Sequence, residues 1–267
     1  MKLISLNTWG GKVFEPLIEF IASQKDSTDI FCFQEIYQND LKVEQVGNIR
    51  ANLLGDFKSL LNNYQIFFYS VIKGYDLDGK FAHEIDLDLE FGLAIFVRKS
   101  LKIKSTGQGV IRDDHTGILN PDFSNLPVYF QFLDFEDKGK NFTICNFHGI
   151  PKPANKLDTP ARINQSKKLL EFLSTKSGAK ILTGDFNLLP ETESIKMLEK
   201  NMRNLVREFE IPRTRSKMSP FYGKPDFQEY ADYTFVSKDI KVESFEVPDI
   251  AVSDHLSMIL QFSTLST

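Results

Sequence analysis

Residues 180–187 read KILTGDFN, a short apolar run that ends in a carboxylate and an amide. Asp185 and Asn187 are residue types that a buried core rarely selects. The same ending recurs near the N-terminus, where LISL runs into Asn7 and FCFQ runs into Glu35. The pattern predicts buried strands whose ends carry polar side chains. The same pattern occurs elsewhere in the chain.

Four further polar residues occupy comparable places. FTICNF ends in His148, Asp232 opens the run DYTFVS, and Asp254 and His255 stand just ahead of the last apolar run. In open α/β sheets, ligands bind in the crevice beyond the strand ends. The positions therefore predict one shared site if these strand ends lie at the same edge of a sheet.

Each polar residue also has an ordinary structural explanation when it is taken alone. Asn7 can close a turn, Glu35 can face solvent at a strand end, and Asp254 can cap a turn. As a set, they would require several independent coincidences, so we favour a functional site. Its carboxylate and amide oxygens are hard ligands, which suit Mg²⁺ or Mn²⁺ better than zinc.

Strand-like runs alternate with amphipathic helices. Apolar spacing predicts helices beginning at Phe14 and over 46–61, and Thr159 with Pro160 predicts a helix start. A short helix is expected after Pro190. Strands are predicted at 2–6, 29–34, 65–71, 92–98, 101–105, 127–135, 141–147, 179–183, 232–237, 241–247 and 256–262. Adjacent strands in the middle do not fit a purely parallel sheet. We therefore expect a single α/β domain over 1–267, a four-layer α/β/β/α sandwich of two packed mixed β-sheets flanked by helices.

Composition narrows the function classes. The 267 residues are 42% hydrophobic and 25% charged, which is typical of a globular protein. A formal net charge of −4 argues against a basic nucleic-acid coat protein but leaves a local basic patch open. Two cysteines, Cys32 and Cys145, are too few for a cysteine-rich zinc site or a disulfide framework. With no signal-like or membrane-spanning run, we expect a cytoplasmic monomer without membrane insertion.

The ordered motifs NTW, QE, NFHG, GDFN, DYTFVS and SDH resemble the endonuclease/exonuclease/phosphatase superfamily. This is the fold of pancreatic deoxyribonuclease and of exonuclease III-type abasic endonucleases. The match runs from Asn7 to His255, and GDFN with a downstream SDH is its specific part. The resemblance implies a Mg²⁺-dependent phosphodiester hydrolase.

The resemblance also implies roles for the matching residues. Glu35 matches the main metal carboxylate, with Asn7 beside it, and Asp254 matches a metal-side aspartate. Asp185 matches the residue that holds or deprotonates the attacking water, with Asn187 as its companion.

The histidines match groups that face the scissile phosphate. His255 matches the main one, oriented by Asp232, and His148 matches a second one found in the deoxyribonuclease branch. Glu90 is a candidate carboxylate partner of His148, with its register left open. Arg162 matches more loosely, in an R-x-x-Q pattern, and is expected on the substrate side.

General chemistry agrees with these roles. In-line displacement at an anionic phosphodiester depends mainly on positioning and electrostatic stabilisation. His255 can serve either as a protonated donor to the phosphate or as a neutral general base, and the sequence leaves both open. The basic segment 211–225 contains Arg213, Arg215 and Tyr222, which could bind phosphates and stack on a base. A solvated charged turn explains that segment equally well.

Three functions follow from the sequence. The favoured one is a nuclease or an end-processing phosphodiesterase acting on DNA or RNA. The second is a phosphatase or lipid phosphodiesterase, of the inositol-phosphate or sphingomyelin type, on the same site. The third is a non-catalytic nucleic-acid-binding module, which the complete carboxylate and histidine set disfavours.

Overall fold

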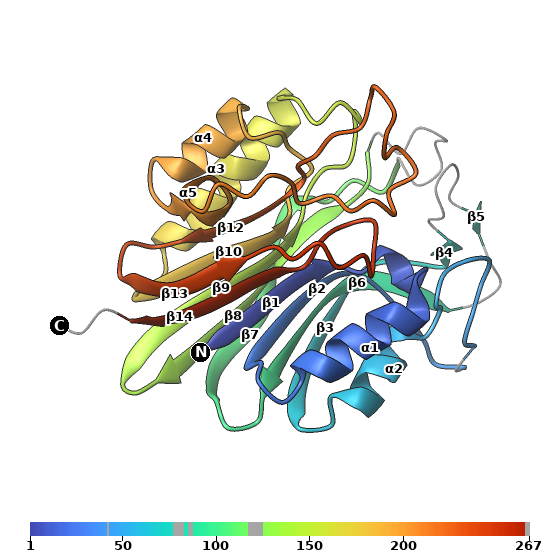
Figure 1. The fold of residues 1–267 in the computed structure, drawn as a ribbon, viewed down its shortest axis with the longest axis horizontal. Helices are drawn as coiled ribbons and strands as arrows, with labels where there is room; N and C mark the ends of the chain where they lie inside the picture. The colour runs from blue at the N-terminus through green and yellow to red at the C-terminus, as the bar shows by residue number, and fades with distance from the viewer. Residues whose placement is uncertain (42, 77–82, 85–87, 117–124, 265–267) are drawn as a thin grey trace.

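Two mixed β-sheets pack face to face with helices on their outer faces, as the sequence predicted (Figure 1). The computed structural model describes residues 1–41, 43–76, 83–84, 88–116 and 125–264. The first sheet contains, in spatial order, β13 (Ile240–Glu246), β14 (Met258–Thr264), β1 (Lys2–Asn7), β2 (Ile30–Asn39), β6 (Leu89–Arg98) and β3 (Tyr64–Lys73). The second contains β11 (Arg203–Asn204), β12 (Asp232–Val236), β10 (Ala179–Asp185), β9 (Lys140–His148), β8 (Val128–Asp137) and β7 (Lys102–Arg112).

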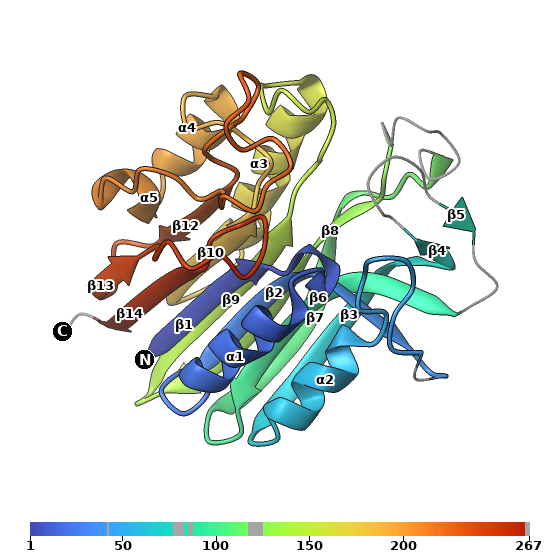
Figure 2. The ribbon, with the colours of Figure 1, turned by 45° about the vertical axis from the view of Figure 1, so that its right-hand side comes forward.

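The helices divide between the two outer faces (Figure 2). The first sheet is covered by α1 (Phe14–Gln24) and α2 (Leu53–Leu60), and the second by α3 (Pro160–Ser174), α4 (Glu193–Glu199) and α5 (Leu205–Glu208). A 3₁₀ turn, η1 (Trp9–Gly11), follows β1, and β4 (Tyr75–Asp76) pairs with β5 (His83–Glu84). None of the helices in the described ranges is long and apolar enough to cross a membrane.

The helix predicted over 46–61 is wrong in its first half. Val46 and Ile49 exchange backbone hydrogen bonds at 3.2 and 3.0 Å, with Gly47 at a φ of +56° between them. This tight turn suits glycine, and it interrupts the apolar periodicity that imitated a helix. The helix α2 therefore begins only at Leu53. By contrast, α3 begins as predicted, because the Thr159 side chain accepts a hydrogen bond from the Arg162 amide.

Each sheet has a parallel pair at its centre, β1 with β2 and β9 with β10. Parallel strands deliver their carboxyl ends to the same edge of a sheet. In the second sheet, Asp185 lies opposite His148 on β9 and opposite Asp232 on β12. Directly opposed residues point to the same face of a sheet. The register thus puts three predicted site residues in one row.

A buried polar contact joins the two sheets behind that row. Gln34 and Asn146 are both 0% exposed, and Gln34 Nε2 donates to Asn146 Oδ1 at 2.6 Å. Asn146 Nδ2 donates in turn to the backbone carbonyls of Phe33 at 3.0 Å and Ala94 at 3.3 Å. Because a buried polar group is costly without its partner, this contact favours one relative position of the sheets.

Replacing Asn146 by leucine should lower the free energy of unfolding by about 2–4 kcal/mol, because several buried groups lose their partners together. Asn141→Leu, an exposed position on the same strand, is the matched control and should cost roughly 0.5 kcal/mol or less. Urea denaturation measures both. Equal losses would show that the contact between the sheets adds nothing to stability.

Candidate active site

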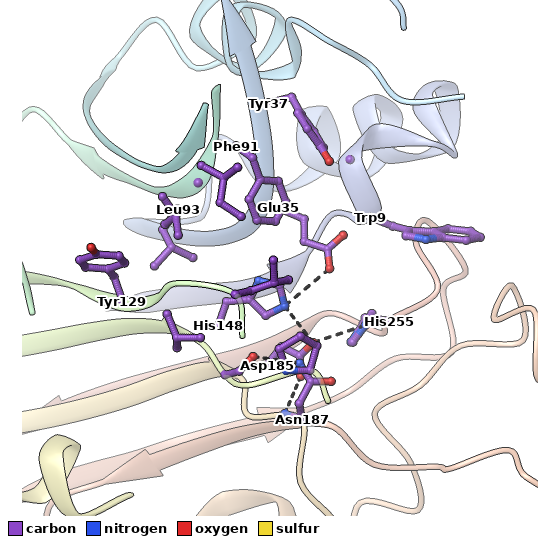
Figure 3. Close-up of a pocket in the computed structure, with 18 of the residues that line it drawn as sticks. Trp9, Glu35, Tyr37, Phe91, Leu93, Tyr129, His148, Asp185, Asn187 and His255 are labelled. Carbon is purple, nitrogen blue, oxygen red and sulfur yellow. Dashed lines mark hydrogen bonds and ion pairs between the residues drawn. The ribbon is translucent and has the colours of Figure 1, made fainter. Parts of the chain in front are cut away.

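A pocket of about 280 Å³ opens where the central strands end (Figure 3). Its polar wall carries Glu35, His148, Asp185, Asn187, Arg215, Asp254 and His255. Its other wall is largely apolar and includes Trp9, Tyr37, Ile49, Phe91, Leu93, Val128 and Tyr129. Figure 3 shows the acidic and imidazole groups gathered below the aromatic rings of Tyr37 and Phe91. The pocket therefore pairs an ionic wall with an apolar one.

Asp185 is the centre of the polar wall and is 2% exposed. Its Oδ2 accepts a hydrogen bond from Asn7 Nδ2 at 3.2 Å. The Nε2 atoms of His255 and His148 lie 3.6 and 3.7 Å from the same oxygen. Asp185 Oδ1 accepts from the backbone amide of Asn187 at 2.8 Å. Residues from β1, β9 and the C-terminal segment thus converge on one carboxylate.

Positive neighbours keep this carboxylate ionised. Burial alone would raise the pKa of Asp185, but the charges of His255, Lys156 and His148 outweigh it and lower the pKa to about 2. At neutral pH Asp185 is therefore a hydrogen-bond acceptor that can orient a water molecule.

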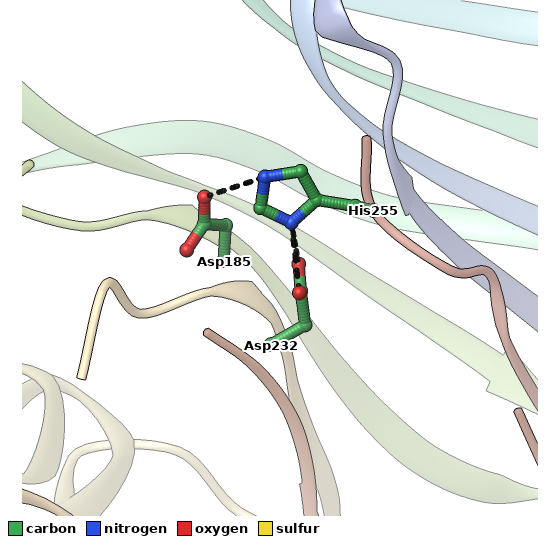
Figure 4. A group of neighbouring side chains, drawn as sticks. All are labelled: Asp185, Asp232 and His255. Atoms are coloured by element: carbon green, nitrogen blue, oxygen red, sulfur yellow. Dashed lines mark hydrogen bonds and ion pairs between the residues drawn. The ribbon is translucent and has the colours of Figure 1, made fainter. Parts of the chain in front are cut away.

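His255 bridges two aspartates, as Figure 4 shows. Its Nδ1 lies 2.8 and 3.0 Å from the carboxylate oxygens of Asp232, which leaves Nε2 facing Asp185. Burial and Arg215 oppose a charged imidazole, but Asp232, Asp254 and Asp185 together raise the pKa of His255 above its ordinary value. Burial also raises the pKa of Asp232, but His255 opposes that rise. Because the Nδ1 of His255 lies 2.8 Å from this carboxylate, we assign the pair as imidazolium and carboxylate.

Comparison with known proteins identifies the family of the chain. A family model described as Endonuclease/Exonuclease/phosphatase family matches residues 4–255. The chain belongs to this family. The family consists of hydrolytic phosphoesterases and is metal-dependent.

Solved structures share the fold at low identity. A mannosyl-6-phosphatase from Bacteroides thetaiotaomicron has a TM-score of 0.70 and 18% identity over 98% of this chain and 99% of that one. The human Nocturnin catalytic domain with bound sulfate has a TM-score of 0.65 and 20% identity over 99% and 93%. Humanized D. rerio TDP2 has a TM-score of 0.66 and 14% identity over 99% of both chains. No curated protein sequence matches significantly.

Glu35 reaches the pocket through a distortion of β2. The strand was predicted to end at 34 but continues to Asn39, and its register with β6 shifts between Phe33 and Ile36. Glu35 lies in this bulge at a φ of +57°. Bulges often re-aim a side chain beside an active site. Here Glu35 Oε1 accepts from Asn7 Nδ2 at 3.0 Å and lies 3.6 Å from His148 Nε2.

The donors fit the metal on which the family depends. The ligand atoms of Asp185, Asp232 and His255 all lie within 4.8 Å of one another, so this group could hold an ion. His255 and Asp232 already hydrogen-bond to each other, whereas the Glu35 side chain is 25% exposed and lines the pocket. Carboxylate oxygens are the ligands that Mg²⁺ prefers. Glu35 is thus the most available donor to such an ion.

Asn7 and Asp254, the other predicted metal residues, have partners within the protein. Asn7 Oδ1 accepts from the Trp9 amide at 3.0 Å, and its nitrogen faces the two carboxylates. Asp254 Oδ2 pairs with Arg215 at 2.6 Å, while its Oδ1 lies 3.8 Å from His255 Nε2. In this structure both residues support their neighbours in the site.

Arg162 does not reach the pocket. It is 0% exposed and donates to the carbonyls of Ile150, Pro153 and Leu157 at 2.7–3.3 Å. A side chain without exposed surface cannot contact a ligand in this structure, so the R-x-x-Q pattern has an internal role. Arg162 holds the loop that follows β9 in place.

Two other residues expected at the site, Glu90 and Arg213, also lie outside the pocket. Glu90 pairs with Lys73 at 2.7 Å, and the carboxylates near His148 are Glu35 and Asp185 instead. Arg213 pairs with Asp249 at 2.7 Å and lies over the ring of Tyr222, on the surface outside the pocket. Within the segment 211–225, Arg215 is the residue that lines the pocket.

Sequence reasoning missed Lys156. This side chain is 9% exposed, and its Nζ donates to Asn187 Oδ1. Burial lowers the pKa of Lys156 to about 8, against the opposing effect of Asp185. Surface lysines are common, so only the tertiary structure distinguishes this one.

The Asp232–His255 pair makes a pH prediction. Asp232→Asn should lower the pKa of His255, which an NMR titration of the imidazole protons measures directly. Because the folded pKa lies above the unfolded value of about 6.5, the pair stabilises the protein fully below that value. The gain is lost as the pH rises through the folded pKa. Asp232→Asn should therefore cost more stability at about pH 6 than at about pH 9. An unchanged His255 pKa would contradict the assignment.

Proposed function

We propose that this protein is a Mg²⁺-dependent phosphodiester hydrolase that acts as a nuclease or end-processing phosphodiesterase on DNA or RNA. The observation that carries the proposal is the buried chain Asp232–His255–Asp185 at the wall of a pocket that Glu35 and His148 also line. Ionised carboxylates beside protonatable imidazoles suit the positioning of water against an anionic phosphate.

Each residue has a place in this chemistry. Glu35 would hold Mg²⁺, which when bound withdraws charge from a phosphate oxygen, while Asn7 donates to Glu35 and Asp254 pairs with Arg215. Asp185 orients the attacking water in line with the scissile bond, and Asn187 donates to the phosphate. Nearby positive charge keeps Asp185 ionised for that task.

Of the two roles considered for His255, the protonated donor is favoured over the neutral general base. A general base must be unprotonated at the working pH, whereas the surrounding carboxylates raise the pKa of His255 and favour its protonated form. We therefore propose that His255 is protonated and donates from Nε2 to the phosphate, with Asp232 holding the ring. His148, which lies 3.6 Å from Glu35, would supply a second donor.

The segment 211–225 supports a nucleic-acid substrate. Phe221 and Tyr222 are 50% and 45% exposed, and the same segment supplies Arg213, Lys217 and Lys224. Exposed rings interleaved with cations bind single-stranded nucleic acid by stacking and phosphate contacts. Arg215, which pairs with Asp254 at 2.6 Å, connects this segment to the pocket wall.

A compact phosphoester is the second candidate substrate. The apolar wall built by Tyr37, Phe91 and Leu93 offers little to a charged backbone and suits an apolar or sugar face. A phosphatase, the mannosyl-6-phosphatase, is also among the structures that share the fold.

Purified protein should hydrolyse a phosphodiester with Mg²⁺ and stop when EDTA is added. Asp185→Asn and His255→Ala should each lower kcat by roughly 10²-fold or more while circular dichroism stays unchanged, because each removes a group that acts in the transition state. Glu193→Gln, an exposed carboxylate on α4, is the charge-matched control and should behave like the wild type. Undiminished activity in the two site variants would refute the site.

Substrate choice follows from the surface outside the pocket. A combined Arg213→Ala and Tyr222→Ala variant should raise KM for single-stranded DNA or RNA about tenfold, because it removes one phosphate contact and one stacking ring. Hydrolysis of the small diester bis-p-nitrophenyl phosphate should not change. If oligonucleotide KM is also unchanged, the compact phosphoester becomes the better candidate, and inositol phosphates, sugar phosphates and sphingomyelin are the substrates to compare.

A further inference from the structure

Lys156 contacts the site from beneath the pocket wall. Its Nζ donates to Asn187 Oδ1, and its backbone carbonyl accepts from the Leu189 amide at 2.9 Å. One residue therefore holds both a side chain and the backbone of the segment that follows Asp185. Burying an ammonium group is costly, so a lysine that is 9% exposed needs such partners.

The chemistry of the ammonium group sets the orientation of Asn187. Ammonium can only donate hydrogen bonds, so Lys156 faces the oxygen of the Asn187 amide and turns its nitrogen away. Nδ2 donates to the Gly149 carbonyl at 3.3 Å, and an amide nitrogen carries a second N–H. Asn187 itself lines the pocket. In this orientation the amide can offer a donor to the pocket.

Orientation matters because a phosphate oxygen only accepts hydrogen bonds. A flipped Asn187 would present its carbonyl oxygen to an anion, which is repulsive. The loop that carries Lys156 is itself braced, since Arg162 donates to the carbonyls of Pro153 and Leu157, both at 2.7 Å. The buried arginine thus fixes the loop, and the loop fixes the lysine.

We propose that Lys156 is a positioning residue that holds the Asn187 amide with its second N–H toward the substrate phosphate. The proposal rests on the proposed function, because Asn187 needs an anion to contact. Lys156 does not touch the substrate and acts through Asn187.

A double-mutant cycle tests this role. With Mg²⁺ and bis-p-nitrophenyl phosphate, Lys156→Met should lower kcat at least tenfold and leave KM within twofold. In the Asn187→Ala background the same change should lower kcat less than threefold, because its target is gone. A merely structural role would slow both backgrounds equally, and that result, or a wild-type kcat in Lys156→Met, would overturn the proposal. Lys167→Met, an exposed lysine on α3, is the control and should stay within twofold.

A second double-mutant cycle, measured by thermal unfolding, does not depend on enzymatic activity. In EDTA and without substrate, the Tm shifts of Lys156→Met and Asn187→Ala should fail to add in the double variant, because the two changes remove one shared contact. Additive Tm shifts would show that Lys156 and Asn187 are not energetically coupled, and this would overturn the proposal. If the wild-type protein hydrolyses no phosphoester, the proposed function fails. The thermal cycle still shows whether Lys156 and Asn187 are coupled. Should Lys156→Met not fold, Lys156→Leu replaces it under the same criteria.

Discussion

The face-to-face packing of two mixed sheets is the constraint on which the rest of the structure depends. Each sheet contributes one parallel pair, and both pairs end at the same side of the molecule. The buried contact between Gln34 and Asn146 lies one residue before Glu35 and two before His148. The position of one sheet on the other is thereby tied to the distance between the two halves of the site.

Charge compensation governs the site itself. Asp185, Asp232 and Asp254 are nearly or fully buried, and each has a cation or an imidazole beside it. Lys156 adds a further positive charge from below. Buried ions are tolerated only when they are paired and hydrogen-bonded. The same pairing keeps Asp185 ionised and raises the pKa of His255.

The strands and α3 could be predicted because their signals are local, namely apolar runs and the Thr159–Pro160 start. The helix over 46–61 could not, since the turn at Gly47 preserves the apolar spacing while breaking the helix. Arg162 and Glu90 were misplaced for another reason. Sequence order says that a residue is near the site, but only packing says which way its side chain points.

The sequence by itself determined the fold class, the family and the identities of the convergent acids and histidines. Strand ends and motifs can be recognised from neighbouring residues and from their order along the chain. Tertiary structure alone decided that Asp254 pairs with Arg215, that Arg162 is internal and that Lys156 reaches Asn187. These are contacts between loops that belong to different strands. Their geometry is set by how the sheets pack, and no local pattern encodes it.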